Sequence, residues 1–270
     1  MACATTISTN FDTVMLGFMQ NDSVVGYYEA AIKIKTILVS VVTSLGAVIL
    51  PRASYYIESK KENEFNSILQ KAMNLVITIA LPLTVYFLFH AEESIYFLSG
   101  EEYKMAIVPM RIIMPTLFLI GVSNIIGFQV FVPLGKEKLV LYSQLIGTIS
   151  NVIINACLIP SMSAIGAAVG TLLAESAVFC YLNFQAKQLK IAKTYAAVRW
   201  GPIILAITTA QSVCLIFKII KLSPFIGLIS SFSTFGAVYF IVLYLFKVPI
   251  VIDTLRDVEL IFHKLIYKLR

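Results

Sequence analysis

Residues 11–54 read FDTVMLGFMQNDSVVGYYEAAIKIKTILVSVVTSLGAVILPRAS, two apolar segments joined by a short polar turn. Four ionisable residues lie inside or beside these segments: Asp12, Glu29, Lys33 and Lys35. An ionisable group at membrane depth is costly unless it faces a water-filled cavity or a partner, so it marks a functional site by default. We therefore predict that this stretch crosses a membrane and contributes to a functional site.

The composition of the whole chain agrees with a membrane protein. Hydrophobic residues make up 59% of the 270 residues, charged residues only 13%, and the mean hydropathy is +0.86. Soluble domains carry about 25% charged residues. Long continuous apolar runs, rather than short alternating strands, favour an all-α bundle over a transmembrane barrel. The fold predicted is a polytopic bundle of about eight membrane helices.

The apolar runs place eight predicted membrane segments along the chain. They cover residues 3–19, 24–50, 72–98, 107–134, 139–158, 165–184, 201–220 and 225–246. Charged or polar loops separate them at residues 54–71, 99–106, 135–138 and 159–164, followed by a basic linker at residues 185–199. Residues 247–270 form a basic tail, which we interpret as an amphipathic helix on the cytoplasmic leaflet or as a solvated end of the last helix.

Basic residues alternate between the two sides of this predicted bundle. Fifteen of the 21 Lys and Arg residues fall on one side and four on the other, and Lys33 and Lys35 lie within a segment. Cytoplasmic loops are enriched in Lys and Arg. The asymmetry predicts an even number of membrane segments with both termini in the cytoplasm, and it assigns the net charge of +6 to the membrane surface instead of to nucleic acid.

Charge pairing is the simplest expectation for the first two segments. Asp12 needs a basic partner or water, and Lys33 or Lys35 would supply it. Glu29 precedes Lys33 by four residues, so the two share one helical face and either pair structurally or line a cavity.

Further polar residues lie in the later segments. Glu175 is either a second acidic site or a carboxyl group hydrogen-bonded to a neighbouring helix. Asn151 and Asn155 stand four residues apart and share a face, from which they bridge helices or line a polar pathway. Gly166 and Gly170 form a small-xxx-small surface, which favours close helix packing.

Signatures of enzymes and cofactor sites are missing from the sequence. The four cysteines are scattered, the two histidines lie far apart, and no Ser/His/Asp constellation or nucleotide-binding loop is present. We predict neither an enzyme, nor a bound metal or other cofactor. A polytopic bundle with ionisable groups in its interior is typical of a transporter.

Several motifs resemble one transporter family in the correct order. They are DTVMLG, VGYYxAAxKI, VILPRAS, SGEEYKMA, PLGKEK, SNVIINACLIP and IGAAVGTLLAES, and they cover about residues 12–184. This pattern is similar to the polysaccharide-biosynthesis flippases, the O-antigen and capsule repeat-unit translocases of the multidrug/oligosaccharidyl-lipid/polysaccharide exporter superfamily.

The resemblance implies a division of the chain. Residues 1–184 would be the second six-helix lobe of a MATE-like flippase, residues 185–246 an extra helix pair, and residues 247–270 the cytoplasmic tail. The first lobe of the family has no counterpart in these 270 residues. The chain would be a half-transporter that pairs with a first-lobe chain or a second copy, a truncated product, or an inactive fragment. The expected location is the bacterial cytoplasmic membrane.

The resemblance also implies a mechanism of alternating access around a cationic cavity. The cavity would hold the head group of a polyprenyl-diphosphate-linked oligosaccharide while the lipid tail stays in the bilayer. Asp12 and Lys33 match charged positions of the family. Lys33 would bind the anionic head group and Asp12 would balance or gate that charge, with Lys35 and Arg111 as further cavity charges.

Two other functions fit the sequence. One is a cation-coupled drug exporter of the same superfamily, with Asp12 or Glu175 as the coupling acid. The other is a membrane subunit that does not transport and docks to a partner through the open face of its lobe.

Overall fold

The computed structural model describes residues 2–47, 49–189, 198–219, 224–252 and 256, and its regular elements there are helices. The chain divides into two compact units, residues 1–197 and 198–270, and the boundary falls inside the predicted linker at residues 185–199. An all-α membrane fold is confirmed. The predicted division into a lobe and an extra pair at residue 184 stays a prediction.

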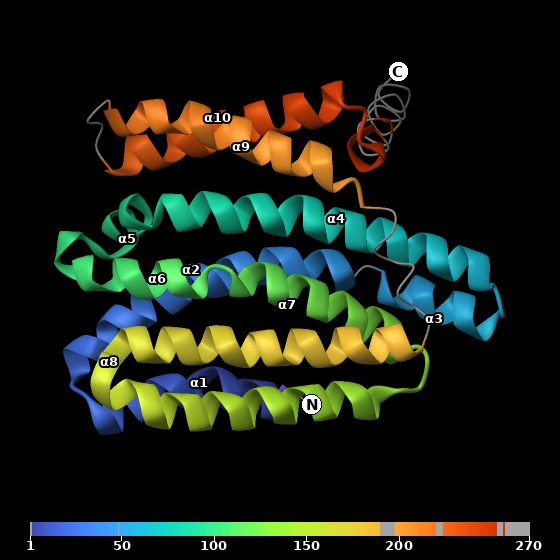
Figure 1. Cartoon of the computed structure of the whole chain (residues 1–270). Coiled ribbons are helices and arrows are strands. Elements are labelled where there is room, and N and C mark those ends of the chain that lie inside the picture. Colours follow the sequence, from blue (N-terminus) through green and yellow to red (C-terminus); the bar gives the residue numbers. More distant parts are fainter. Residues whose placement is uncertain (1, 48, 190–197, 220–223, 253–255, 257–270) are drawn as a thin grey trace, which may run out of the picture. The chain divides into compact units, whose positions relative to one another are not determined.

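The first unit contains most of the helices (Figure 1). In chain order they are α1 (Ala2–Met19), α2 (Asp22–Ala47), α3 (Leu50–Glu58), α4 (Glu62–Phe89), α5 (Ala91–Ser99), the 3-10 helix η1 (Glu101–Ala106), α6 (Ile107–Ile113), α7 (Thr116–Asn124), the π-helix η2 (Ile125–Phe131) and α8 (Glu137–Gln188).

Local sequence signals explain where α2 begins and where α5 ends. The side chain of Asn21 accepts a hydrogen bond from the backbone N–H of Val24 at 3.0 Å, which caps the start of α2. Gly100 follows the last residue of α5 with φ +89°, a left-handed conformation that glycine adopts without strain. The polar turn predicted after the first segment is therefore the place where α1 ends and α2 begins.

Helix α8 is a hairpin of two antiparallel arms (Figure 1, yellow-green to yellow). Its 52 residues reverse direction at Ser163, where φ is 51° and ψ is −132°. Residues that approach each other closely, such as Gly147 with Val178 and Gly166 with Leu158, have residue numbers that add up to nearly the same value, as antiparallel arms require. The two segments predicted at residues 139–158 and 165–184 are these arms.

The predicted straight segment at residues 107–134 is broken in the structure. The helix pair Glu101–Ile113 and Thr116–Phe131 bends by 44°, and Pro115 stands at the break. Proline disfavours helical continuity because it lacks a backbone N–H and its ring crowds the preceding turn. Beyond the bend, α7 widens into the π-helix η2, and such π segments occur often at functional sites.

The predicted charged loop at residues 54–71 is wrong. Helix α3 extends to Glu58 and α4 already begins at Glu62, so only a short connection separates them. The acidic loop at residues 99–106 is largely the 3-10 helix η1. Charged residues can continue a membrane helix past the apolar core, because their charged groups reach the polar interface there.

Several helices are suited to crossing a membrane. By length and hydropathy, four stretches of the described residues qualify, or five when the bent pair is one span: Asp22–Glu58, Glu62–Phe89, Glu137–Gln188, Phe225–Leu245 and the pair Glu101–Ile113 with Thr116–Phe131. The stretch Glu137–Gln188 supplies two passes because α8 reverses. Six of the predicted segments each correspond mainly to one helix or one arm, although α1 is not among these stretches and the apolar part of α9 is shorter. The other two are divided: the segment at residues 72–98 between α4 and α5, and the segment at residues 107–134 among α6, α7 and η2.

Basic residues of the first unit gather at one end of its helices. The end of α2 lies beside the end of α7 and η2, because a Cβ atom added at Gly46 would collide with the side chains of Asn124 and Gln129. The start of α8 is there too, since Gly127 abuts Val140. This end carries Arg52, Lys60, Lys61, Lys136, Lys138 and Lys187. At the opposite end Tyr27 of α2 packs edge-on against Tyr103 of η1, near the acidic pair Glu101 and Glu102.

The second unit consists of α9 (Trp200–Ile219) and α10 (Pro224–Leu245), which pack against each other. Arg199 donates to the carbonyl oxygens of Phe246 and Lys247 at 3.3 Å, which satisfies carbonyl groups after the end of α10. The predicted amphipathic tail falls almost entirely on residues 253–270, of which the structure describes only Arg256.

Candidate functional site

Asp12 lies at the centre of a buried polar network. The residue is 3% exposed, and its carboxyl group accepts hydrogen bonds from the hydroxyl of Tyr28 at 2.7 Å, the amide of Asn155 at 2.7 Å and the hydroxyl of Thr171 at 2.6 Å. The hydroxyl groups of Tyr28 and Thr171 also contact each other at 2.9 Å. The network joins α1, α2 and both arms of α8. A carboxyl group in an apolar bundle is thus surrounded by donors, as burial of a polar group requires.

The partners of Asp12 differ from the ion pair that we predicted with Lys33 or Lys35. Within the described part of the chain, Asp12 accepts hydrogen bonds from hydroxyl and amide groups of α2 and of both arms of α8, and it forms no ion pair. The physical reason is the direction of the side chains. Tyr28 bonds directly to Asp12, and the backbone of Lys35 lies seven residues, about two turns, further along α2.

The predicted shared face of Asn151 and Asn155 is confirmed. The amide of Asn155 donates to the side-chain oxygen of Asn151 at 3.2 Å and also bridges to Asp12 on α1. Close packing at Gly166 and Gly170 is confirmed too. A side chain at Gly166 would lie 2.6 Å from the carbonyl oxygen of Leu158, and one at Gly170 would overlap the amide of Asn155. Gly170 therefore makes room for the polar network.

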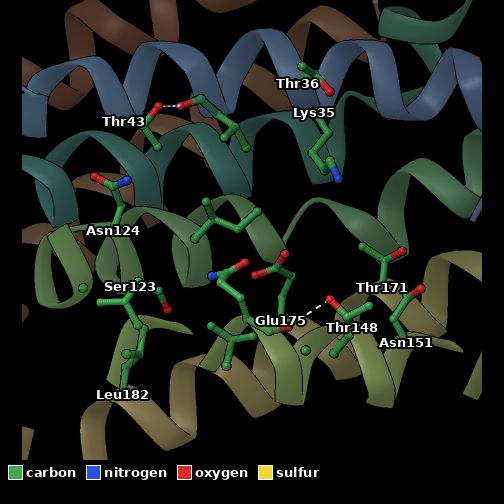
Figure 2. Close-up of a pocket in the computed structure, with 18 of the residues that line it drawn as sticks. Lys35, Thr36, Thr43, Ser123, Asn124, Thr148, Asn151, Thr171, Glu175 and Leu182 are labelled. Atoms are coloured by element: carbon green, nitrogen blue, oxygen red, sulfur yellow. Dashed lines mark hydrogen bonds between the residues drawn. The ribbon is translucent and has the colours of Figure 1, made fainter. Parts of the chain in front are cut away.

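A cavity of about 580 Å³ opens beside this network (Figure 2). It lies between α1, α2, α7, η2 and the two arms of α8, entirely within the first unit. Its polar lining residues are Asp12, Lys35, Thr36, Thr43, Ser123, Asn124, Gln144, Thr148, Asn151, Thr171 and Glu175. Pockets of about 300–1,000 Å³ are typical of small-molecule sites.

The cavity contains charges of both signs. Lys35 extends from α2 into it, and Glu175 lies on the second arm of α8 (Figure 2). Both side chains are half-buried, and Lys35 is within electrostatic reach of Glu175 and Asp12. Neither Lys35 nor Glu175 forms a hydrogen bond or an ion pair with another described side chain. These two groups are therefore available to a ligand.

Three other predicted site residues are not brought to this cavity. Lys33 and Glu29 are exposed on α2, and Arg111 is exposed on α6. Glu29 accepts a hydrogen bond from Thr13 of α1, and the described residues show no ion pair between Glu29 and Lys33. Lys33 and Glu29 thus occupy an open face of α2, whereas Lys35 occupies the enclosed one.

Sequence reasoning missed residues that hold the site together. Tyr28 and Thr171 complete the Asp12 network, yet each looks like an ordinary residue of an apolar helix. Gln20 was missed as well: its amide donates to the carbonyl oxygen of Ile159 at 3.1 Å and accepts from Ser163 at 3.0 Å, which ties α1 to the reversal of α8. Its position at the end of an apolar segment was the available signal.

A comparison with protein families identifies the family of the chain. The sequence profile of the MatE family matches residues 1–157, which hold α1, α2, Asp12, Lys35 and the first arm of α8. The chain belongs to the MatE family. This MatE chain is 22% identical over 247 residues to the probable low-salt glycan biosynthesis flippase Agl15 of Haloferax volcanii, covering 91% of the chain and 51% of Agl15.

One further curated relative and one solved structure resemble the chain. The probable flippase AglR of Haloferax volcanii is 27% identical over 164 residues, covering 60% of the chain and 34% of AglR. Among solved structures, the inward closed conformation of the lipid II flippase MurJ superposes with a TM-score of 0.71 at 17% identity, covering 90% of the chain and 51% of MurJ. The likeness to MurJ shows the fold. The MatE chain spans about half the length of Agl15 and of MurJ.

Proposed function

We propose that this MatE protein takes part in moving lipid-linked oligosaccharides across a cell membrane, as a transporter and not as an enzyme. The observation that carries the proposal is Lys35 in the cavity. Lys35 is the basic residue among the described residues that line the cavity, and it has no described partner there. A lysine brings a compact charge with three donors, which suits a diphosphate. The names of the relatives Agl15 and AglR support a glycan-flipping role.

Asp12 has a separate role in this proposal. Its three hydrogen bonds connect α1, α2 and both arms of α8. Because these are the helices that surround the cavity, we infer that Asp12 fixes the shape of the cavity and balances the charge of Lys35. Glu175, which lies across the cavity, sets the local charge against which an anionic head group competes.

The cellular setting is also part of the proposal. We propose a bacterial cytoplasmic membrane, with the basic ends of α2 and α8 and both termini in the cytoplasm. Partners would be the polyprenyl-diphosphate-linked oligosaccharide and either a first-lobe chain or a second copy of this chain. The exposed pair Glu29 and Lys33 on α2 supports such a partner, because charged groups on a membrane helix need a polar neighbour.

A flipping assay tests the proposal. The 270-residue chain is placed in liposomes with a fluorescent farnesyl-diphosphate-linked disaccharide, and the fraction of probe that an external quencher reaches is followed over time. We expect the wild-type chain to exchange the probe between leaflets and Lys35→Ala to slow the exchange at least tenfold, because the diphosphate loses its counter-charge.

Two lysine variants control this experiment. Lys138→Ala lies outside the cavity and should leave the rate unchanged. Lys33→Ala separates the two faces of α2: loss of exchange in Lys33→Ala but not in Lys35→Ala would move the anion site to the exposed face. A wild-type chain that does not exchange the probe would contradict flipping by this chain alone.

A second candidate function is cation-coupled drug export. It is favoured by the MatE profile together with a buried acid, Asp12, whose neighbours Asn151, Asn155 and Thr171 are oxygen-bearing side chains. A drug-accumulation assay distinguishes it. Reduced export of a cationic dye in Asp12→Asn, with unchanged exchange of the lipid probe, would favour the drug exporter.

A further inference from the structure

The polar lining of the cavity is chemically divided. Its charged residues are Asp12, Lys35 and Glu175, and Glu175 follows Thr171 of the Asp12 network by about one helical turn. The opposite part, which we call the neutral end, is lined by uncharged residues of α2, α7, η2 and α8: Thr43, Ser123, Asn124, Phe128 and Gln144. Figure 2 shows Thr43, Ser123 and Asn124 on one side and Lys35, Asn151 and Thr171 on the other.

The helical rise gives the length of the neutral end. Thr43 follows Lys35 by eight residues on α2, which is about 12 Å along the helix axis. On the first arm of α8, Gln144 precedes Asn151 by seven residues, which is about 10 Å. A ligand whose charged group contacts Lys35 would therefore extend two or three turns along the helices to reach Thr43 and Gln144.

Buried polar atoms at the neutral end have no described partner. Ser123 is 8% exposed and lines the cavity, and its hydroxyl oxygen forms no hydrogen bond with another described residue. Gln129 of η2 does not line the cavity; it is 2% exposed and its side-chain oxygen is also unsatisfied among the described residues. An unsatisfied buried polar atom is costly, and a ligand that bonds to the hydroxyl group of Ser123 would recover part of that cost.

The neutral end is held in place by a close approach of α2 and η2. A side chain at Gly46 would lie 2.7 Å from the amide nitrogen of Gln129 and 3.0 Å from the side-chain oxygen of Asn124. Gly46 thus allows both amides to pack against the backbone of α2. The π-helical turns of η2 direct Gly127 and Phe128 to the cavity from the same segment. Both amides therefore lie directly against the backbone of α2.

We propose that the neutral end is the saccharide subsite of the cavity, with Ser123 and Asn124 as specificity-determining residues. Hydroxyl and amide side chains both donate and accept, as do the hydroxyl groups of a sugar. Phe128 offers an apolar face to the C–H face of a sugar ring. A phosphate would instead require basic groups, and the described lining residues of this end include none. The inference rests on the proposed function, in which Lys35 holds the diphosphate.

Binding measurements separate the two parts of the cavity. The 270-residue chain in lipid nanodiscs is titrated with farnesyl diphosphate and with farnesyl diphosphate carrying one or two sugars from a panel of glucose, galactose and N-acetylglucosamine. We expect at least one glycosylated probe to bind the wild-type chain at least tenfold more tightly than bare farnesyl diphosphate. The double variant Ser123→Ala with Asn124→Ala should lose this gain and bind bare farnesyl diphosphate normally. Lys35→Ala should weaken both.

Matched variants outside the cavity serve as controls. Ser176 and Asn183 lie on the second arm of α8, donate to backbone carbonyl groups and do not line the cavity. Ser176→Ala with Asn183→Ala should keep the gain from the sugar. Gly46→Ala, which displaces the amide of Asn124, should reduce that gain and leave the binding of bare farnesyl diphosphate intact.

The possible outcomes test the saccharide subsite separately from the proposed function. If bare farnesyl diphosphate binds but no sugar of the panel adds affinity, or if the gain survives in the Ser123 and Asn124 variant, the saccharide subsite is wrong and the diphosphate site stands. If neither bare nor glycosylated probe binds the wild-type chain, the proposed function and the subsite both fail.

Discussion

Asp12 illustrates how a single acid is accommodated inside a membrane bundle. Three donors from α2 and α8 surround its carboxyl group, and none of them is a cation. Hydrogen bonds between membrane helices contribute about 0.6 kcal/mol each on average, because the unfolded chain in the bilayer also finds partners. Asp12 therefore stabilises the folded chain through several hydrogen bonds that each contribute a small free energy.

Removal of the Asp12 carboxyl group should loosen the first unit. We expect Asp12→Ala to lower the free energy of unfolding by about 2 kcal/mol, because three hydrogen bonds are lost and their donors remain buried. Thermal unfolding of the purified chain in detergent, followed by circular dichroism, measures it. Asp22→Ala, at an exposed position in the first turn of α2, is the control and should cost less than 1 kcal/mol. An equal loss in both variants would contradict the network.

Residue roles on α2 were only partly predictable. The sequence marks Glu29, Lys33 and Lys35 as unusual, because charges are rare in such a segment. It does not reveal which face of α2 borders the cavity, since apolar residues occur on nearly every side of this helix. The two lysines differ by two positions, which is more than half a turn, and only packing against α8 assigns Lys35 to the inside.

At the scale of elements, the α8 hairpin positions most of the site. Its arms contribute Asn151, Asn155, Thr171 and Glu175, and the approach at Gly170 sets their spacing. The two arms were predictable, because a polar turn separates two apolar runs. Their side-by-side register was not, since it depends on which side chains fit against Gly166 and Gly170.

Enlargement of Gly170 should separate the arms. Gly170→Ala places a methyl group on the amide of Asn155, and overpacking of this kind costs about 1–3 kcal/mol. We expect a lower melting temperature in the same unfolding assay. Gly17→Ala, where no atom lies within 4 Å, is the control and should be neutral or slightly stabilising.

A double variant identifies the cause. Asn155→Ala removes the group that the methyl displaces, so Gly170→Ala should cost less in that background than in the wild-type chain. Additive losses would show that the two residues are not coupled and would contradict the close approach.

At the scale of the molecule, the helix directions of the first unit follow from the same contacts. The end of α2, the start of α8 and the end of its second arm are together, and they carry the basic loops. The acidic η1 is near the other end of α2. The loops that are rich in Lys and Arg therefore lie together at one end of the first unit. The positive-inside rule concerns such a difference between two ends.

Labelling of single cysteines tests the orientation. In a variant without the four native cysteines, we expect Ser59→Cys and Lys138→Cys to react with a membrane-impermeant maleimide only after permeabilisation of the cells, because the basic end faces the cytoplasm. Glu101→Cys, in η1, should react in intact cells. The reverse pattern would overturn the orientation, and labelling of all three in intact cells would overturn the direction of the helices.

The sequence by itself determined the class of the protein. Its hydropathy, helical segments and charge alternation depend on transfer of each segment into lipid, which is a property of local composition, and its motifs resembled the correct superfamily. Tertiary structure decided the site. Tyr28, Thr171 and Ser123 became functional candidates, Lys35 entered the cavity and Lys33 stayed outside, because contacts between residues up to 159 positions apart depend on how helices pack and not on their composition.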